Sequence, residues 1–181
     1  MQVDFSAYDN NWYKPGNAIK RCLWHYTNLV FFKSGWFPVY SLKVFLLKLF
    51  GAVVGKKVCI KPYVNIKYPW FLNIGNQVWI GEDVWIDNLT DVIIGDNVCI
   101  SQGALLITGS HDYSAANFGL LMKPIKIEDG VWICAKAVIC GGVVCGNHCI
   151  ITAGAVATQN CEPFGMYRGN PAKLFKTRSI M

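Results

Sequence analysis

The stretch VWIGEDVWIDNLTDVIIGDNVCI, residues 78–100, decides the fold of this chain, because an aliphatic residue recurs in it at a nearly fixed interval. Ile80, Ile86, Ile94 and Ile100 are separated by six or eight residues, and a Gly or polar residue directly follows each. A six-residue period fits neither an α-helix of 3.6 residues per turn nor a plain two-residue alternation. It fits short strands separated by tight corners.

The same interval continues on both sides of this stretch, over fifteen positions of which thirteen are Val, Ile or Leu. These positions are Val54, Ile60, Ile66, Ile74, Ile80, Ile86, Ile94, Ile100, Leu106, Ile127, Ile133, Ile139, Cys145, Ile151 and Ala157. Four residues later follows a second series of small or β-branched residues, from Val58 to Ala155. Such self-similarity predicts an all-β solenoid of about five three-sided coils, whose stacked aliphatic residues form one core. Gly or Asn at a corner would meet a requirement for positive φ.

The interval is broken once, between Leu106 and Ile127, within the solenoid predicted over residues 54–162. This gap predicts an ejected loop, residues 107–124, which contains the sequence TGSHDYS with His111. Loops held on a rigid scaffold commonly carry chemistry. His111 is the only one of the three histidines in that loop, and neutral imidazole is well matched to act as a base near pH 7.

Both ends of the chain differ from the repeat. Residues 1–53 contain apolar residues at helical spacing, Ile19, Leu23, Tyr26 and Val30, and a second apolar segment from Val39 to Phe50. We expect these helical segments to cover the open end of the solenoid or to lie on a membrane, and the two roles are compatible. In the tail, residues 163–181, Asn170 and Pro171 predict the start of a short C-terminal helix.

Charge is distributed unevenly along the chain. Residues 1–67 contain ten Lys and Arg but only Asp4 and Asp9, whereas residues 68–181 contain seven Lys and Arg and nine acids. The basic end indicates one of two things: an anionic partner, such as a membrane surface or a diphosphate-linked substrate, or a solvated basic face that keeps the protein soluble. Nucleic acid is not expected, because no recognition motif accompanies the charge.

The sequence limits where the protein can be located and whether it is expected to bind a metal ion. The chain has no apolar run long enough to span a membrane and its first residues do not resemble a secretory signal, so we expect a cytoplasmic protein, peripheral at most to the membrane. Its eight cysteines include no C-x-x-C pair and are interpreted as free thiols that fill the repeat. The three scattered histidines give no reason to expect a metal site.

The repeat over residues 54–175, together with TGSHD and RGNPAK, resembles the hexapeptide-repeat acyltransferases, and most closely the O-acetyltransferases of colanic acid and other exopolysaccharide pathways. The resemblance implies a left-handed parallel β-helix. It also implies an acetyl-CoA-dependent O-acetyltransferase, acting by direct transfer on a sugar or lipid-linked saccharide with His111 as general base. Homotrimeric assembly is a further implication.

The resemblance also assigns further residues. Asp87 or Asn88 would orient the imidazole or contact the acceptor, and which of them does so stays open. The amide of Ala135 would stabilise the oxyanion. The remaining residues would bind the cofactor: Trp132, Ala153 and Thr158 along the CoA arm, and Lys173 and Lys176 at its phosphates. The alternatives are a non-catalytic scaffold and an acyltransferase with a non-sugar acceptor such as serine.

Overall fold

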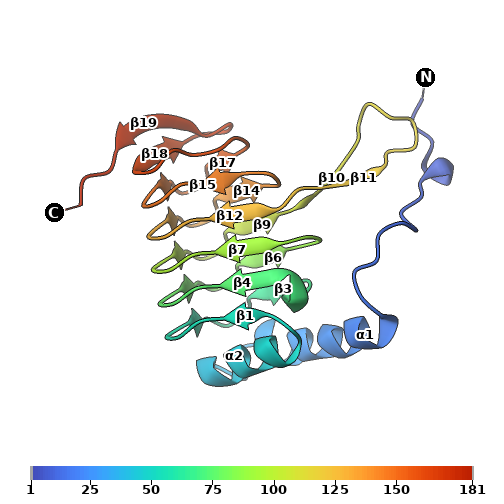
Figure 1. Ribbon diagram of the computed structural model, residues 1–181, viewed down its shortest axis with the longest axis horizontal. Helices are drawn as coiled ribbons and strands as arrows, with labels where there is room; N and C mark the ends of the chain where they lie inside the picture. Colours follow the sequence, from blue (N-terminus) through green and yellow to red (C-terminus); the bar gives the residue numbers. More distant parts are fainter. Residues whose placement is uncertain (1, 181) are drawn as a thin grey trace.

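Residues 2–180 are described by the structure, a computed structural model, and most of them form a solenoid of short parallel strands (Figure 1). Three sheets run along its length. Sheet A contains β1 (Val53–Val54), β4 (Leu72–Ile74), β7 (Val92–Ile94), β12 (Ile125–Ile127) and β15 (Val144–Cys145). Sheet C contains β3 (Asn65–Ile66), β6 (Trp85–Asp87), β9 (Leu105–Ile107), β14 (Val138–Cys140) and β17 (Val156–Ala157).

Sheet B is longer, since it continues past the last complete coil. Its strands are β2 (Cys59–Ile60), β5 (Trp79–Ile80), β8 (Cys99–Ile100), β13 (Trp132–Ile133), β16 (Ile150–Ile151), β18 (Gly165–Arg168) and β19 (Lys173–Thr177). Sheets A and C have five strands each, so the chain makes five complete coils, and β18 begins a sixth. The predicted number of coils is therefore correct to within one partial turn.

The core is the aliphatic ladder read from the sequence. All fifteen residues of the first series are buried, and so are the members of the second series that follow them at the corners. Burying a Val, Leu or Ile side chain contributes roughly 1.5–3 kcal/mol, so the ladder is the main source of stability along the solenoid. Since a single coil has neighbours on two sides only, each rung depends on the rungs next to it.

Corner glycines have two roles, and the predicted one is confirmed at four of them, among them Gly103 and Gly154, which have positive φ. Positive φ occurs at the third corner position, which is occupied mostly by residues such as Lys57, Gln77 and Asn97. The glycines that directly follow the buried aliphatic residues are needed for space. A Cβ built on Gly55 would lie 2.5 Å from the carbonyl oxygen of Gly75 in the next coil. The coils are stacked too closely at this point for any side chain.

The two predicted N-terminal helices are present. The first is α1 (Ala18–Thr27), which begins at the side-chain cap Asn17 and continues as a π-helical turn, η2 (Asn28–Phe32). The second is α2 (Tyr40–Leu49). Short 3-10 turns occur at η1 (Phe5–Ala7) and η3 (Pro69–Phe71). Both helices lie across the open end of the first coil (Figure 1).

The helices cap the solenoid through polar contacts as well as packing. Trp24 Nε1 donates to the carbonyl oxygen of Ile66 at 2.8 Å, and Lys43 Nζ donates to that of Lys61 at 2.8 Å. These carbonyls belong to the first coil, which has no coil below it. Burial lowers the pKa of Lys43 to about 8. Trp24, Phe32 and Leu47 fill the space between the helices and the first coil.

The face of α1 that caps the solenoid is not the apolar face noted in the sequence. Trp24 and Asn28 are buried against the coil, whereas Ile19, Leu23 and Tyr26 are exposed on the outer side of the helix. In residues 2–180, no helix has the length and apolar character needed to cross a membrane.

The predicted C-terminal helix is wrong. Residues 173–177 form β19, which pairs antiparallel with β18. Without this strand, β18 would leave its backbone N–H and C=O groups unpaired at the end of sheet B. Pairing satisfies them and closes the edge, and five residues in a short helix would not.

Candidate active site

The break in the repeat forms a β-hairpin that projects from the side of the solenoid (Figure 1). Its strands are β10 (Gly109–His111) and β11 (Leu120–Met122), paired antiparallel with His111 opposite Leu120. The segment predicted as an ejected loop is thus largely ordered by its own backbone pairing. The N-terminal segment also runs against it, since the amide of Asp4 donates to the carbonyl of Ala116 at 2.9 Å.

The hairpin fixes the orientation of the His111 ring. Its Nδ1 lies 2.9 Å from the carbonyl oxygen of Phe118, and the two rings are stacked with centroids 4.3 Å apart. A carbonyl can only accept, so Nδ1 carries the hydrogen and Nε2 keeps its lone pair. In this tautomer Nε2 can accept a proton from a substrate.

The orienting group is therefore a backbone carbonyl and not one of the predicted side chains. Asn88 is fully buried, and its amide bonds both the N–H and the C=O of Tyr68 in the coil below. Asp87 forms an ion pair with Lys67 at 2.9 Å. Asp112, adjacent to His111, accepts from the hydroxyl and the amide of Ser114, and these hydrogen bonds lower its pKa. No pattern in the sequence indicates Phe118, because the acceptor is a backbone carbonyl, which every residue has.

His111 lines a cavity of about 430 Å³ between the hairpin, the solenoid and the N-terminal segment. Its lining contains the cations Lys14, Arg21 and Lys67, and its aromatic residues are Tyr8, Tyr13 and Tyr68. The hydroxyl of Tyr13 donates to the carbonyl of Leu89 at 2.6 Å, which holds the N-terminal segment against the solenoid. Desolvation raises the pKa of this tyrosine, so it is a neutral donor. The cavity combines a base, cations and flat rings.

The residues predicted to bind the cofactor lie on other parts of the surface. Trp132 on β13 is partly exposed and donates from Nε1 to Ser101 Oγ at 2.9 Å. Lys173 and Lys176 are exposed on β19. Thr158 directly follows β17 and is exposed.

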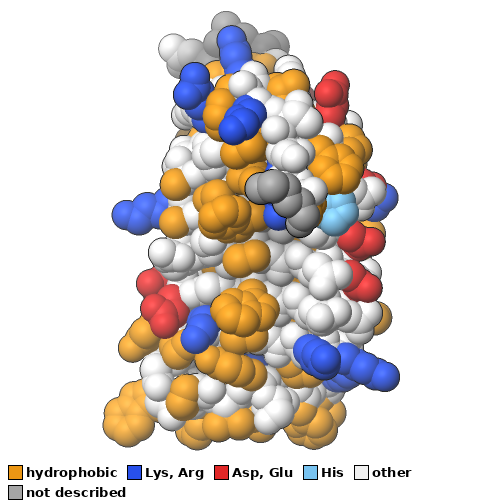
Figure 2. Space-filling model, turned by 90° about the vertical axis from the view of Figure 1, so that its left-hand side faces the viewer, with side chains coloured by type: hydrophobic (Ala, Val, Ile, Leu, Met, Phe, Trp, Pro, Cys, Tyr) orange, Lys and Arg blue, Asp and Glu red, His pale blue; other side chains and the backbone are white. Residues whose placement is uncertain are grey.

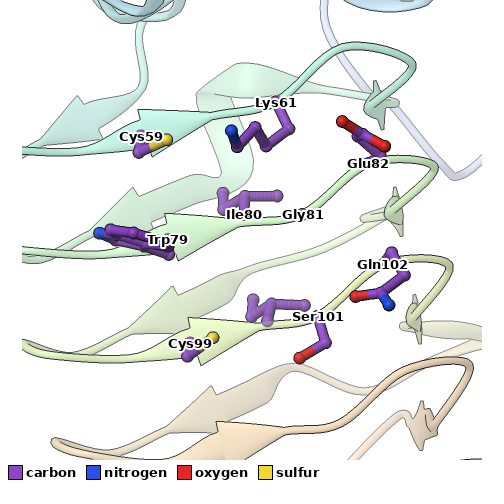
Figure 3. Close-up of a pocket in the computed structure, with 10 residues that line it drawn as sticks. Cys59, Lys61, Trp79, Ile80, Gly81, Glu82, Cys99, Ser101 and Gln102 are labelled. Atoms are coloured by element: carbon purple, nitrogen blue, oxygen red, sulfur yellow. The ribbon is translucent and has the colours of Figure 1, made fainter.

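Ala135 and Ala153 occupy the same corner of successive coils, between sheets B and C. The amide of Gly154 donates to the carbonyl of Ala135 at 3.0 Å, which stacks the two corners directly. Within residues 2–180, the amides of Ala135 and Ala153 donate to no acceptor. Glu82 and Gln102 occupy this position in the two preceding coils (Figure 3). Their amides likewise donate to no acceptor within residues 2–180. The corner between sheets B and C therefore presents a column of free N–H donors, which we call the open corner.

Within one chain the structure does not bring His111 and Ala135 together. The hairpin leaves from the end of β9, and Ala135 precedes the start of β14, which lies parallel to β9 in sheet C. His111 thus lies at the edge of sheet C that is formed by the ends of its strands, and Ala135 lies at the edge formed by their starts. Ala153 shares the edge of Ala135, whereas Thr158 shares that of the hairpin.

Metal ligands and cysteine thiols are the other groups that could bind a ligand or take part in catalysis. Within residues 2–180, no group of three or more His, Cys, Asp and Glu side chains is arranged to hold a metal ion. Cys134 and Cys140 are free thiols beside the site, and burial raises the pKa of both.

Comparison with known proteins identifies the family. No family model matches the sequence. The chain is 36% identical over 168 residues to a protein of Escherichia coli (strain K12) named "Putative colanic acid biosynthesis acetyltransferase WcaF", covering 92% of this chain and 91% of that protein. It is 31% identical over 134 residues to the galactoside O-acetyltransferase of the same organism, covering 72% of this chain and 66% of the relative.

The chain belongs to the hexapeptide-repeat acetyltransferases. A hexapeptide-repeat acetyltransferase of Vibrio cholerae, solved with acetyl coenzyme A, superposes with a TM-score of 0.82 at 24% identity over 91% of each chain. A galactoside acetyltransferase solved with coenzyme A gives a TM-score of 0.78 at 27% identity, over 88% of this chain and 80% of the other. The solenoid is accordingly the left-handed parallel β-helix of this family.

Proposed function

We propose that this hexapeptide-repeat acetyltransferase transfers the acetyl group of acetyl-CoA to a hydroxyl of a sugar, with His111 as the general base. The observation that carries the proposal is the hydrogen bond from His111 Nδ1 to Phe118, which leaves Nε2 free at a cavity large enough for a sugar. The named activities of the relatives, colanic acid biosynthesis and galactoside O-acetylation, support the reaction class.

The reaction needs one base and consumes no reactant besides acetyl-CoA and the sugar. Nε2 takes the proton of the sugar hydroxyl as the oxygen attacks the thioester carbonyl. The tetrahedral intermediate collapses, the C–S bond breaks, and the imidazolium returns the proton to the departing thiolate. The products are a sugar acetyl ester and free CoA.

Direct transfer, without an acyl-enzyme, is supported by the state of the cysteines. A covalent route through a cysteine needs a thiolate nucleophile. The thiols nearest the proposed machinery, Cys134 and Cys140, have raised pKa values because they are buried. They are therefore protonated at neutral pH and are poor nucleophiles.

The open corner supports a place for the cofactor and for the oxyanion. A developing negative charge on the thioester oxygen is stabilised by a preorganised N–H that has no other acceptor. Ala135 offers such an N–H, and Ala153 offers another in the next coil. In the proposal the CoA arm runs along this corner past Trp132 and Ala153, and its phosphates meet Lys173 and Lys176. Thr158 contacts the arm from the hairpin edge of the neighbouring chain.

Assembly into a homotrimer completes the proposal. His111 and Ala135 lie at opposite edges of sheet C, so one chain would place its base against the open corner of a neighbour. A closed ring of copies supplies each such pair once. The family resemblance implies that the ring contains three chains. Each active site would then lie between two chains.

We further propose that the acceptor carries a phosphate, as in a sugar phosphate or a saccharide on a lipid diphosphate. The cavity beside His111 contains Lys14 and Arg21, and neither forms an ion pair with a carboxylate within residues 2–180. Unpaired cations in a sugar-sized cavity favour an anionic group there. Peripheral membrane contact through the basic N-terminal segment agrees with a lipid-linked acceptor.

Paired acceptors test the reaction and the acceptor class separately. Purified protein is incubated with acetyl-CoA and either a neutral sugar or its phosphate ester, and release of CoA thiol is recorded. We expect turnover with the ester, and Arg21→Gln should raise its KM about ten- to hundredfold, since a charge-assisted hydrogen bond is lost.

The matched control is Lys126→Gln, which removes a cation on β12 and should leave the KM unchanged. Equal use of both acceptors, with no effect of Arg21→Gln, would reject the phosphate but retain the acetyl transfer. An absence of turnover with every acceptor would support the non-catalytic scaffold instead.

A further inference from the structure

The outer side of the helical end carries an apolar surface that nothing within residues 2–180 covers. Ile19, Leu23 and Tyr26 are spaced along one side of α1 and are 73%, 58% and 61% exposed. On α2, Phe45 and Leu49 are exposed in the same way, at 59% and 66%. Proteins in solution rarely leave large contiguous apolar patches uncovered, and such patches commonly mark an interaction site.

The exposed residues of the two helices form one surface. Leu23 of α1 and Leu49 of α2 line a single cavity of about 470 Å³, together with Ile19 and Phe50. Both helices lie across the end of the solenoid, so their outer sides face the same direction (Figure 1). In Figure 2, hydrophobic side chains gather along this lower end of the molecule. We call the five residues Ile19, Leu23, Tyr26, Phe45 and Leu49 the end surface.

The charges around the end surface are all of one sign. No Asp or Glu occurs between Asp9 and Glu82, whereas Lys48 is exposed on α2 and Lys33 is exposed directly after η2. Lys56 and Lys57 are exposed at the first corner above them. Within residues 2–180, none of these four cations is in an ion pair.

The combination of apolar side chains and unpaired cations favours one of the partners that could cover the end surface. A second copy docked end to end would bring two basic surfaces together without a carboxylate to pair with either. An anionic lipid surface offers negative headgroups for the cations and an apolar interior for the side chains, and its flat shape matches two helices lying in one plane.

We infer that the end surface binds the face of an anionic lipid bilayer, with α1 and α2 lying in the headgroup region. This deepens the peripheral contact included in the proposed function and rests on it for its purpose, since a lipid-linked acceptor has to be reached at a membrane. The capping role of the helices is retained, because capping uses the opposite sides of α1 and α2.

Cosedimentation with vesicles tests the inference without acetyl-CoA or any acceptor, so it can fail independently of the acetyl transfer. The protein should pellet with vesicles of phosphatidylcholine and phosphatidylglycerol, and at least about tenfold less with phosphatidylcholine alone. The double variant Leu23→Ser, Leu49→Ser should lower binding to the mixed vesicles at least about tenfold. Lys33→Gln with Lys48→Gln should also weaken it, by about tenfold or more.

The control variant is Ile93→Ser, which removes an exposed aliphatic residue on β7 at the side of the solenoid and should bind vesicles like the unchanged protein. Melting curves establish that all variants are folded. The inference is overturned if the unchanged protein does not pellet with the mixed vesicles, or if Leu23→Ser, Leu49→Ser binds them normally. It is also overturned if that variant changes the number of chains in the assembly, because the end surface would then be a contact between copies.

Discussion

Two corners of each coil have the same backbone path but opposite hydrogen-bonding states. Between sheets A and B, a side chain of the next coil accepts from each corner amide: Asn76 Nδ2 and N–H donate to Asp96, and the amide of Asp96 donates to Asp129 Oδ1 at 2.7 Å. We call this the sealed corner. At the open corner between sheets B and C, the corresponding amides of Glu82, Gln102, Ala135 and Ala153 have no acceptor within residues 2–180.

Within one coil, the sealed corner serves stability and the open corner can serve binding and catalysis. A buried or crowded N–H that already has an acceptor cannot bind a ligand, whereas a free N–H on a rigid corner is a preorganised donor. The sealed corner uses its donors to connect the coils. The open corner leaves them available, and the two alanines expected to contact the cofactor and the oxyanion both lie there.

The largest expected difference in kcat is between variants of His111 and of His148. His111 lies on the hairpin, and His148 lies at the sealed corner, where it has a positive φ and its ring packs on Phe164. His111→Ala should lower kcat by about 10²- to 10⁴-fold, because general base catalysis is lost. His148→Asn, which tolerates the positive φ, should leave kcat unchanged.

Steady-state acetyl-CoA turnover measures both variants, and tryptophan fluorescence titration with CoA shows whether each still binds the cofactor. Undiminished kcat in His111→Ala would remove the imidazole from the mechanism.

Removing one donor from the open corner should have the next largest effect. The first coil already has a proline at this position, Pro62, so the backbone path accepts one. Ala135→Pro deletes an N–H that donates to no acceptor within residues 2–180, and it should lower kcat about 10²- to 10³-fold with little change in Tm.

Glu82→Pro makes the same change at the open corner of a lower coil, and its kcat should stay at the level of the unchanged enzyme. If the two prolines reduce kcat equally, or if Ala135→Pro has no effect, the open corner has no special role in the reaction.

A change at the sealed corner should have the smallest effect and should alter stability alone. Asp96→Ala removes the acceptor of the Asn76 amide and should lower Tm by a few degrees while kcat is retained. Gln102→Ala, at the open corner, should leave Tm unchanged.

The Tm difference caused by Asp96→Ala should depend on pH. Hydrogen bonds from Asn76 lower the pKa of Asp96 below its unfolded value. Its contribution is therefore present above an unfolded pKa near 3.9 and is lost as the pH falls through the lower folded value. Calorimetry should find the Tm difference at neutral pH and a smaller one under acid conditions, and a difference that grows in acid would contradict the assignment.

The sequence was most informative where one residue type has one physical consequence. The aliphatic interval predicts the coils because a buried position in a three-sided solenoid accepts few other side chains, and all fifteen positions are buried. The helical spacing of Ile19, Leu23 and Tyr26 predicts the first helix for a similarly local reason, and α1 is present there. The gap after Leu106 predicts that the chain leaves the solenoid there.

Other features depend on partners that the sequence does not reveal. The tail containing Lys173 and Lys176 forms a strand because β18 offers an unpaired edge. His111 is oriented by the carbonyl of Phe118, which no residue pattern marks. The outward position of Leu23 on α1 follows from which side of the helix meets the first coil.

By itself, then, the sequence determined the repeat, its interruption and the single histidine within it, because periodic burial and the loss of periodicity are properties of neighbouring residues along the chain. Only the tertiary structure decided which corner amides are free, which tautomer His111 adopts and which side of the helices stays bare. These depend on backbone groups and surfaces that become partners only after the coils are stacked.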